Sequence, residues 1–446
     1  MRQRLLPVLA IILFHASALQ AQAPPSVETL TWEGVLHWLE SHRSTAPDFS
    51  GGDVLGVSDL EKLAPFVPPG FHGQLRFDGF EMEIQEAQDF APHASYRDAS
   101  LQFGPQTELR EDRSLANYVS GQPFSHERII GATAADAAYM VAWNRVFRWQ
   151  YFGYASDSIH FVYLRPGERQ GRNSEVDTAL LGGGAVERHL KEDYQRVYLS
   201  HLSTLAADKY ALDVDGADTL HYKEYLTFTH PFEMRGSTFV IERPLDAFEE
   251  DQVNSYLPTE RRVRRLSPKE RADSFVGSEF TLDDFEGFSG RVLDYDWIYH
   301  GEKAVLHVAD TRDEHAKFFG PGSWIAKDRW QLRNTYVVEQ RPHLAEHPYS
   351  RKLLFVDRQN FNIAFALIFD RQDRLFKILY STYQWPGDDD DGTLPQNTVA
   401  HWKSGVAINL EKNNGSLVWS EETEVSEVKP SAVRRLFSVS NLTGGR

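Results

Sequence analysis

The chain has 446 residues, of which 41% are hydrophobic and 25% are charged, a composition typical of a globular protein. Its 47 basic and 64 acidic side chains give a formal net charge of −17. This balance excludes most nucleic-acid binders, because they need Lys and Arg to neutralise phosphates. The absence of cysteine excludes disulfides, thiolate metal sites, a cysteine nucleophile and lipid attachment through an N-terminal cysteine.

The first 23 residues have the pattern of an export signal. Two arginines precede an apolar run from Leu5 to Phe14, and small residues then lead to cleavage sites after Ala21 or Ala23. The run is too short to span a bilayer, and nothing later reaches the roughly 18 apolar residues that spanning requires. We therefore expect residues 24–446 to lie free in the bacterial periplasm, neither lipid-anchored nor membrane-spanning; an uncleaved N-terminal anchor is the alternative.

Residues 24–150 are expected to form a part rich in helices and loops. Apolar residues at helical spacing predict a first helix over 32–39. The capping-box pattern of residues 58–61 predicts a short second helix that Pro65 ends, and Thr133 is expected to cap a third helix to about Arg148. These signals are structural and imply no chemistry.

From about residue 158 the hydrophobic period changes to two, which indicates strands. Residues 293–299 alternate in this way. In the stretch from Phe361 to Phe369 large side chains alternate mostly with small ones, so we expect the large side to fill a deep interior. Short turn-like links at 357–360, 370–373 and 414–415 predict hairpins. Residues 151–410 are therefore predicted to form one antiparallel sheet, in a single domain with residues 24–150.

Signature motifs of enzymes are missing from the sequence. It holds no G-x-S-x-G, no H-E-x-x-H and no phosphate-binding loop. His307, His343 and His347 are expected to make ordinary polar contacts. Acidic stretches at 213–224 and 388–391 carry oxygen ligands without the spacing of a Ca²⁺ loop, and their binding of Ca²⁺ is left open. We expect no catalytic residue, no resident metal and no cofactor.

A basic ribbon stands out in this acidic chain. Arg262 and Arg264 share one face of a predicted strand, and acids mixed with three phenylalanines follow, up to Phe285. One interpretation is an ion-paired edge strand that resists pairing with other chains. The other is a rim where Arg meets an anionic head group while aromatic rings cover an apolar tail.

The same segment carries a family resemblance. Tyr256-Leu-Pro-Thr-Glu-Arg-Arg-Val-Arg-Arg265 and Ser274-Phe-Val-Gly-Ser-Glu-Phe-Thr-Leu-Asp-Asp284 resemble the signature of outer-membrane lipoprotein-sorting proteins, with Glu279 where those proteins more often have Asp. The chain as a whole, over about Val54 to Leu410, resembles the family catalogued as domain of unknown function 1329. The pair Trp143-Asn144 and the stretch 288–297 are typical of that family.

The resemblance implies a mainly β (α+β) fold of the LolA-like type. Its sheet would be a large curved antiparallel one, an incomplete β-barrel with helices covering its mouth and an apolar cavity for a lipid or another hydrophobic ligand. Relatives of the family are often encoded beside exporters of the resistance-nodulation-division (RND) class and outer-membrane proteins. A transporter of this class and an outer-membrane protein are therefore implied partners. The chain is much longer than a minimal carrier of this type.

Together these observations favour a non-enzymatic periplasmic carrier or chaperone for a hydrophobic ligand. An envelope hydrolase using the carboxylates of Asp294 and Asp296 is one alternative, and a docking module of an outer-membrane complex is another. The residues predicted to contact the ligand are Tyr256, Arg262, Arg264, Phe275, Phe280, Phe288, Trp297, Tyr336, Phe365 and Phe369.

Overall fold

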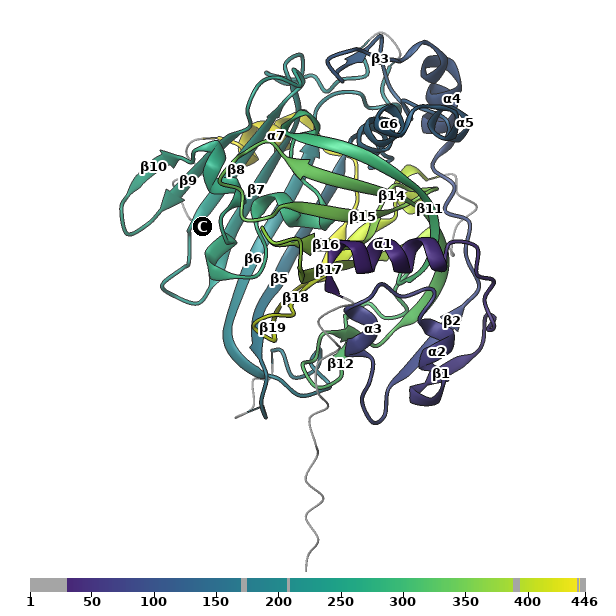
Figure 1. Ribbon diagram of the computed structural model, residues 1–446. Helices are drawn as coiled ribbons and strands as arrows, with labels where there is room; N and C mark the ends of the chain where they lie inside the picture. Colours follow the sequence, from purple (N-terminus) through teal and green to yellow (C-terminus); the bar gives the residue numbers. More distant parts are fainter. Residues whose placement is uncertain (1–29, 170–174, 207–208, 388–393, 439–440, 442–446) are drawn as a thin grey trace, which may run out of the picture.

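The computed structural model (Figure 1) describes residues 30–169, 175–206, 209–387, 394–438 and 441. The predicted export signal and the acidic run at 388–391 lie outside these residues. Within the described ranges, no helix is both long enough and apolar enough to cross a membrane.

A sheet of 15 strands dominates the described part of the chain. Its order is β1-β2-β14-β15-β16-β17-β18-β19-β5-β6-β7-β8-β9-β10, and β11 also pairs with β14. The two ends of this path do not pair with each other, so the sheet is open. Its strands are β1 (Val54–Gly56), β2 (Glu81–Gln85), β5 (Gly153–Arg165), β6 (Ala185–Tyr198), β7 (Leu220–His230), β8 (Thr238–Pro244), β9 (Gln252–Leu257), β10 (Arg262–Arg265), β11 (Tyr295–His307), β14 (Arg329–Pro342), β15 (Arg351–Asp357), β16 (Ile363–Phe369), β17 (Leu375–Gln384), β18 (His401–Asn409) and β19 (Asn414–Glu424).

Nearly all neighbouring strands are antiparallel, as predicted, but only some are joined by short turns: β5 and β6 are linked by residues 166–184, and β6 and β7 by residues 199–219. The exception is β2, which comes from the N-terminal part and pairs in parallel with the start of β14. The predicted links at 357–360 and 370–373 do join β15 to β16 and β16 to β17. The last hairpin turns slightly earlier than predicted, because Asn409 already pairs with Asn414 and Asn413 takes the left-handed turn conformation with φ 50°.

Among the described residues, all α-helices except α7 come before β5, and three of them match the predicted ones. The first predicted helix is α1, and α6 begins after Thr133, whose hydroxyl accepts a hydrogen bond from the backbone of Asp136 at 3.2 Å. The short α2 ends before Pro65, but the predicted cap by Ser58 is not formed: Asp59 precedes the helix without a side-chain bond to it, and its carboxylate accepts from the Gly56 backbone at 3.1 Å. The helices are α1 (Trp32–Ser41), α2 (Leu60–Leu63), α3 (Phe71–Gln74), α4 (Ala94–Phe103), α5 (His126–Gly131), α6 (Ala134–Val146) and α7 (Pro430–Leu436). Two small hairpins, β3 (Glu108–Leu109) with β4 (Leu115–Ala116) and β12 (Phe318–Phe319) with β13 (Ile325–Ala326), stand apart from the main sheet, and 3-10 turns occur at η2 (Val57–Asp59), η3 (Gly104–Gln106) and η9 (Pro395–Thr398).

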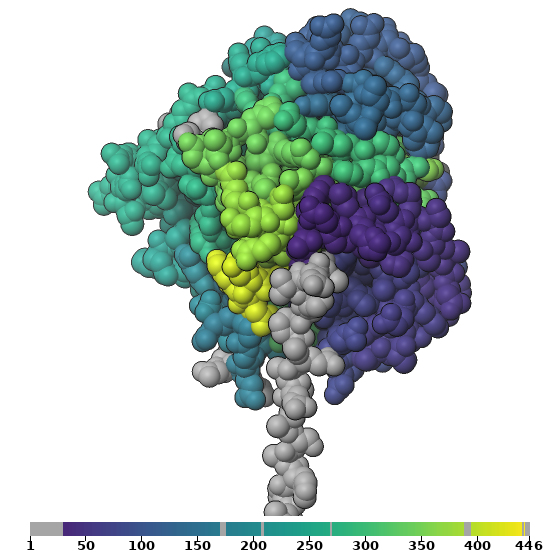
Figure 2. Space-filling model, in the orientation of Figure 1, coloured from purple at the N-terminus to yellow at the C-terminus, as the bar shows by residue number. Residues whose placement is uncertain are grey.

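One face of the sheet is covered by α1, α2, α3 and the β12–β13 hairpin. The large side of β16 packs here. Phe369 meets Trp32 of α1 edge-on at 5.1 Å between ring centroids, and Phe365 meets Phe71 of α3 at 5.2 Å. Figure 2 shows the N-terminal residues, in purple, packed directly against the green strands. The predicted deep interior is therefore filled by side chains of the N-terminal helices.

The opposite face is crossed by a single irregular segment, residues 266–294, which links β10 to β11 and is called the crossing segment below. It contacts β16, β17 and β18 on one side, and its rings meet rings of β5, β7 and β8 on the other. Strands so far apart in the sheet order can share one short segment only if the face is concave. Helix α6 packs at the β11–β14 end of this face. The predicted mainly β, curved and open sheet is confirmed. The crossing segment contains the 3-10 turns η4 (Pro268–Ala272), η5 (Phe275–Gly277), η6 (Leu282–Gly287) and η7 (Val292–Asp294).

Candidate functional site

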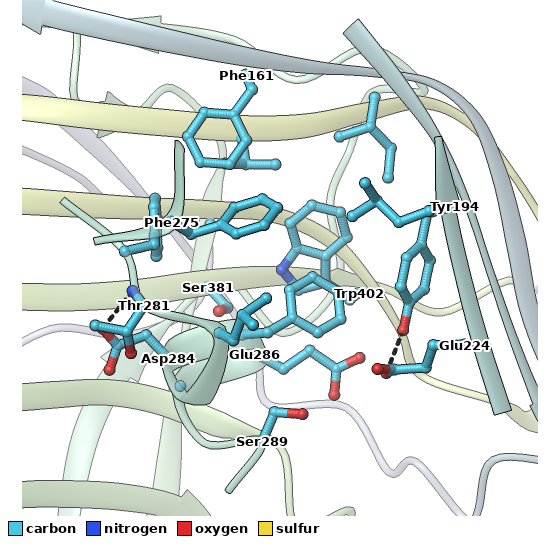
Figure 3. A pocket seen from close by; sticks show the side chains of 18 of the residues that line it. Phe161, Tyr194, Glu224, Phe275, Thr281, Asp284, Glu286, Ser289, Ser381 and Trp402 are labelled. Atoms are coloured by element: carbon cyan, nitrogen blue, oxygen red, sulfur yellow. Dashed lines mark hydrogen bonds between the residues drawn. The ribbon is translucent and has the colours of Figure 1, made fainter. Parts of the chain in front are cut away.

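A pocket lies between the crossing segment and the concave face, against β5–β8 and β17–β18 (Figure 3). The space not occupied by atoms is about 910 Å³, and this figure includes open solvent at the mouth of the pocket. Its wall is mostly aromatic and aliphatic, and its rings are those of Phe161, Tyr194, Phe239, Phe275, Phe280, Phe285 and Trp402.

Two of these rings come from one tight loop, residues 274–281, called the roof loop below. The backbone N–H of Phe275 donates to the carbonyl of Phe280 at 2.8 Å, and the Ser278 hydroxyl donates to the carbonyl of Phe275 at 2.8 Å. Gly277, with φ 82°, allows the turn between them. The loop thereby presents both phenylalanine rings toward Phe161 of β5, at 6.3 and 5.9 Å between centroids.

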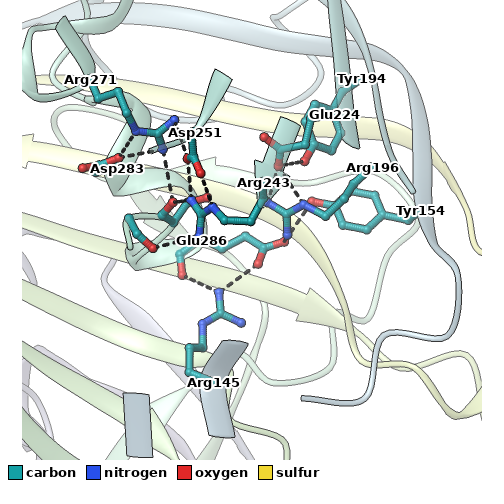
Figure 4. A network of polar contacts seen from close by, with 12 residues as sticks. Arg145, Tyr154, Tyr194, Arg196, Glu224, Arg243, Asp251, Arg271, Asp283 and Glu286 are labelled. Atoms are coloured by element: carbon teal, nitrogen blue, oxygen red, sulfur yellow. Dashed lines mark hydrogen bonds and ion pairs between the residues drawn. The ribbon is translucent and has the colours of Figure 1, made fainter. Parts of the chain in front are cut away.

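Buried ion pairs fasten the crossing segment to the sheet and to α6 (Figure 4). The carboxylate of Glu286 contacts Arg145 at 2.8 Å, Arg148, and Arg196 of β6 at 3.7 Å, and accepts a hydrogen bond from the Tyr154 hydroxyl at 2.9 Å. Burial alone would raise the pKa of Glu286, but the three arginines hold it well below its ordinary value. Glu286 is therefore a charged anchor.

A second group of buried ion pairs, formed by other residues, also anchors the crossing segment. Arg271 of the crossing segment contacts Asp251 at 3.1 Å and Asp283 at 2.7 Å, and Arg243 of β8 also binds Asp251, at 2.8 Å. Burial would raise the pKa of Asp251, yet Arg243 and Arg271 lower it. The segment is thus held to β8 and to the start of β9 by charge pairs.

A third anchor ties the segment to β15 and β17. Asp284 pairs with Lys352 of β15 and accepts from the Tyr349 hydroxyl at 2.8 Å. Lys377 of β17 donates to the carbonyl of Glu279 in the roof loop at 2.6 Å. The acids of this segment were visible in the sequence, but their basic partners are scattered along the chain and no local pattern marks them.

Four acidic side chains reach the pocket wall, and they differ in their partners. Asp284 and Glu286 belong to the anchors above, and Glu224 accepts from Tyr194 and Arg196, each at 2.7 Å. Glu192 of β6 is only 4% exposed, and its Oε2 atom has no hydrogen-bond partner. Burial, with a smaller contribution from the neighbouring Asp193, raises the pKa of Glu192 to about 8.

The residues predicted to contact a ligand lie in several places. Phe275 and Phe280 line the pocket. Phe365 and Phe369 face the N-terminal helices on the other side of the sheet. The others form two groups: Phe288, Trp297 and Tyr336 pack in a closed apolar cluster against α6, and Tyr256, Arg262 and Arg264 lie in the β9–β10 hairpin, outside the pocket wall.

The basic ribbon forms the last strand of the sheet path. All residues of β10 are exposed, and in the described part of the chain this strand pairs only with β9. Arg262 contacts Glu260 at 3.0 Å and Arg264 contacts Glu270 at 3.8 Å. These contacts agree with the interpretation of the ribbon as an ion-paired edge strand.

Several pocket residues were not singled out from the sequence. Phe161 belongs to the alternation of Ile159, Phe161 and Tyr163 in β5, which marks a buried strand face without telling what covers it. Trp402 and Glu192 lie in strands whose sequence patterns do not differ from those of strands outside the pocket. The signal that was present is the phenylalanine spacing of the roof loop.

The alternative sites do not assemble. Asp294 pairs with Arg291, while the exposed Asp296 accepts from His343 at 3.0 Å, so the two carboxylates serve different partners. Glu224, the last residue of the acidic stretch from 213, is committed to Arg196. Across the described residues, no three or more His, Asp or Glu side chains converge as metal ligands.

These features define a class: a mainly β protein whose open, curved sheet holds a ring-lined pocket on its concave face. The chain belongs to the family described as protein of unknown function (DUF1329), whose model matches residues 57–442. No curated protein matches it.

Solved structures similar to this chain come from several bacteria. One, from Vibrio parahaemolyticus, is described as an outer membrane lipoprotein-sorting protein domain; it has 15% identity and a TM-score of 0.44 over 69% of this chain and 99% of its own. A DUF1329 family protein from Desulfovibrio piger has 16% identity and a TM-score of 0.43 over 70% and 100%. A LolA superfamily protein from Nitrosomonas europaea has 13% identity and a TM-score of 0.35 over 69% and 98%.

Proposed function

We propose that this protein binds a hydrophobic molecule, such as a lipid, in the pocket beneath the roof loop, and that it acts as a carrier or chaperone rather than as an enzyme. The observation that supports this proposal is the ring-lined pocket on the concave face. Burial of an acyl chain there would gain about 0.8 kcal/mol per methylene group, without any chemical step.

The roof loop is the natural gate of such a site. Its two phenylalanines cover the pocket, while the anchors of Asp283, Asp284 and Glu286 hold the following residues in place. A ligand would enter by moving the loop about this base, which requires breaking the hydrogen bonds from Lys377 to the Glu279 carbonyl and from Tyr163 to the Val276 carbonyl. Phe275 and Phe280, among the predicted contact residues, are the ones that this mechanism uses.

Location and partners form a separate part of the proposal. The export-signal pattern supports a periplasmic protein, and the family resemblance supports service to an RND-type transporter and an outer-membrane protein. Either partner would receive or supply the ligand by passive exchange. The separated carboxylates of Asp294 and Asp296 give the hydrolase alternative no support.

The binding proposal is tested with the purified protein from residue 24 onward. Native mass spectrometry after extraction with several lipid mixtures should detect a bound hydrophobe, and the fluorescent probe N-phenyl-1-naphthylamine should bind and be displaced by it. Phe275→Ala should weaken probe binding about tenfold, because a phenyl contact is lost. Phe248→Ala, which removes a 58% exposed ring outside the pocket wall, is the matched control. A wild-type protein that binds neither lipids nor the probe would refute the proposal.

A further inference from the structure

One carboxyl group in the pocket wall has an oxygen atom that finds no hydrogen-bond partner among the described residues. Glu192 lies in β6 between Ile159 of β5 and Phe228 of β7, both apolar and buried. Its side chain is 4% exposed, Oε2 has no hydrogen bond, and it makes no ion pair with any described residue. A buried polar atom without a partner costs about 1–3 kcal/mol, so such groups are usually satisfied by something.

We propose that Glu192 is the polar recognition residue of this pocket, and that the ligand is an apolar molecule with one uncharged, oxygen-bearing end such as a hydroxyl or an ester carbonyl. The inference rests on the proposed function and adds the class of head group. The apolar body of the ligand would lie against Phe161, Phe239 and Phe275, with its oxygen on the Glu192 carboxyl.

The charges around the pocket favour an uncharged end. Among the described residues, the arginines nearby are already ion-paired, Arg196 with Glu224 and Arg271 with Asp251 and Asp283, so an anionic head group would have to compete with these carboxylates. A cationic head group would require ionised Glu192, and moving both charges into an apolar wall costs more than a neutral hydrogen bond. The raised pKa of Glu192, a consequence of burial, keeps the carboxyl protonated at neutral pH and thus able to donate.

The test uses the protein from residue 24 onward, with 1-decanol and decylamine as probes that displace N-phenyl-1-naphthylamine. The variants are Glu192→Leu, which removes the polar group, and Glu192→Gln, which keeps a donor. Asp193→Asn, adjacent in β6 and outside the pocket wall, is the matched control. At pH 7, decanol should bind Glu192→Leu about tenfold more weakly than wild type, and Glu192→Gln and Asp193→Asn within about threefold of wild type.

Binding measured at two pH values distinguishes a hydrogen bond from Glu192 to the ligand from mere packing of the Glu192 side chain against it. Raising the pH from 7 to 9.5 should weaken binding of methyl decanoate, whose ester carbonyl can only accept a hydrogen bond, to wild type, because Glu192 loses its proton, and should leave Glu192→Gln unchanged. Equal decanol affinity in wild type and Glu192→Leu would overturn the inference, and so would a preference for decylamine over decanol. If the naphthylamine probe binds but these differences are missing, only the head-group assignment fails. If wild type binds no probe, the proposed function fails as well.

Discussion

Glu192→Gln should make the protein more stable at neutral pH, although it removes a native side chain. In the folded protein, burial raises the pKa of Glu192 from its ordinary 4.5 to about 8, so the unfolded chain ionises this group while the folded chain does not. The contribution of Glu192 to stability is therefore fully present below pH 4.5 and is lost as the pH rises toward 8. The loss is about 1.4 kcal/mol per pH unit, or about 3 kcal/mol by pH 7. Glutamine does not titrate, so the Glu192→Gln variant does not lose this free energy as the pH rises.

Urea unfolding, followed by tryptophan fluorescence, measures this effect at several pH values. The difference in unfolding free energy between Glu192→Gln and wild type should grow from pH 4.5 to pH 8 and then stay constant. Titration of groups that do not interact with Glu192 cancels in this difference. Asp193→Asn removes the neighbouring carboxyl group, which accepts a hydrogen bond from the Ser158 backbone and whose pKa burial also raises, so it should give a smaller difference of the same sign. A difference that is independent of pH, or a variant that loses stability as the pH rises, would refute the reasoning.

Three further predictions concern stability, each measured by urea or thermal unfolding. Glu286→Gln should cost about 3–5 kcal/mol, because the buried Arg145 and Arg148 lose their counter-charge while Arg196 keeps only Glu224; a loss below about 1 kcal/mol would contradict the anchor. Burial lowers the pKa of His307 and His401 to about 4, so stability should fall between pH 6.5 and 4, and His307→Gln should flatten that decline; an unchanged slope would argue against it. Gly287→Ala should destabilise the crossing segment, since φ is +84° and an added Cβ would lie 2.6 Å from Ile363; unchanged stability would show that the backbone relaxes there.

The elements of the fold could be predicted because their signals are local. The alternation of large and small side chains predicts the strand β16, and the capping residue Thr133 predicts the start of α6. What covers each strand face is not local. Phe365 and Phe275 are both rings in β-rich surroundings, yet one meets a helix from the N-terminal part and the other faces the pocket.

The residues that line and anchor the pocket could not be predicted from the sequence for the same reason. Arg145 and Glu286 are separated by 141 residues, and only the folded sheet makes them partners. An isolated glutamate such as Glu192 looks like any solvent-facing strand residue until its neighbours are known. The roof loop was recognised because its residues are contiguous.

The route of the crossing segment has a mechanical consequence. It leaves from β10, one extreme of the strand order, and ends at β11, beside β14 near the other extreme. The crossing segment thus links the two ends of the open sheet covalently, although in the described part of the chain no strand hydrogen bonds join these ends. Any widening of the space between these ends must stretch this segment or detach its buried charges. Because the crossing segment limits how far the two ends of the sheet can separate, the pocket should restrict the width of a bound ligand more strictly than its length.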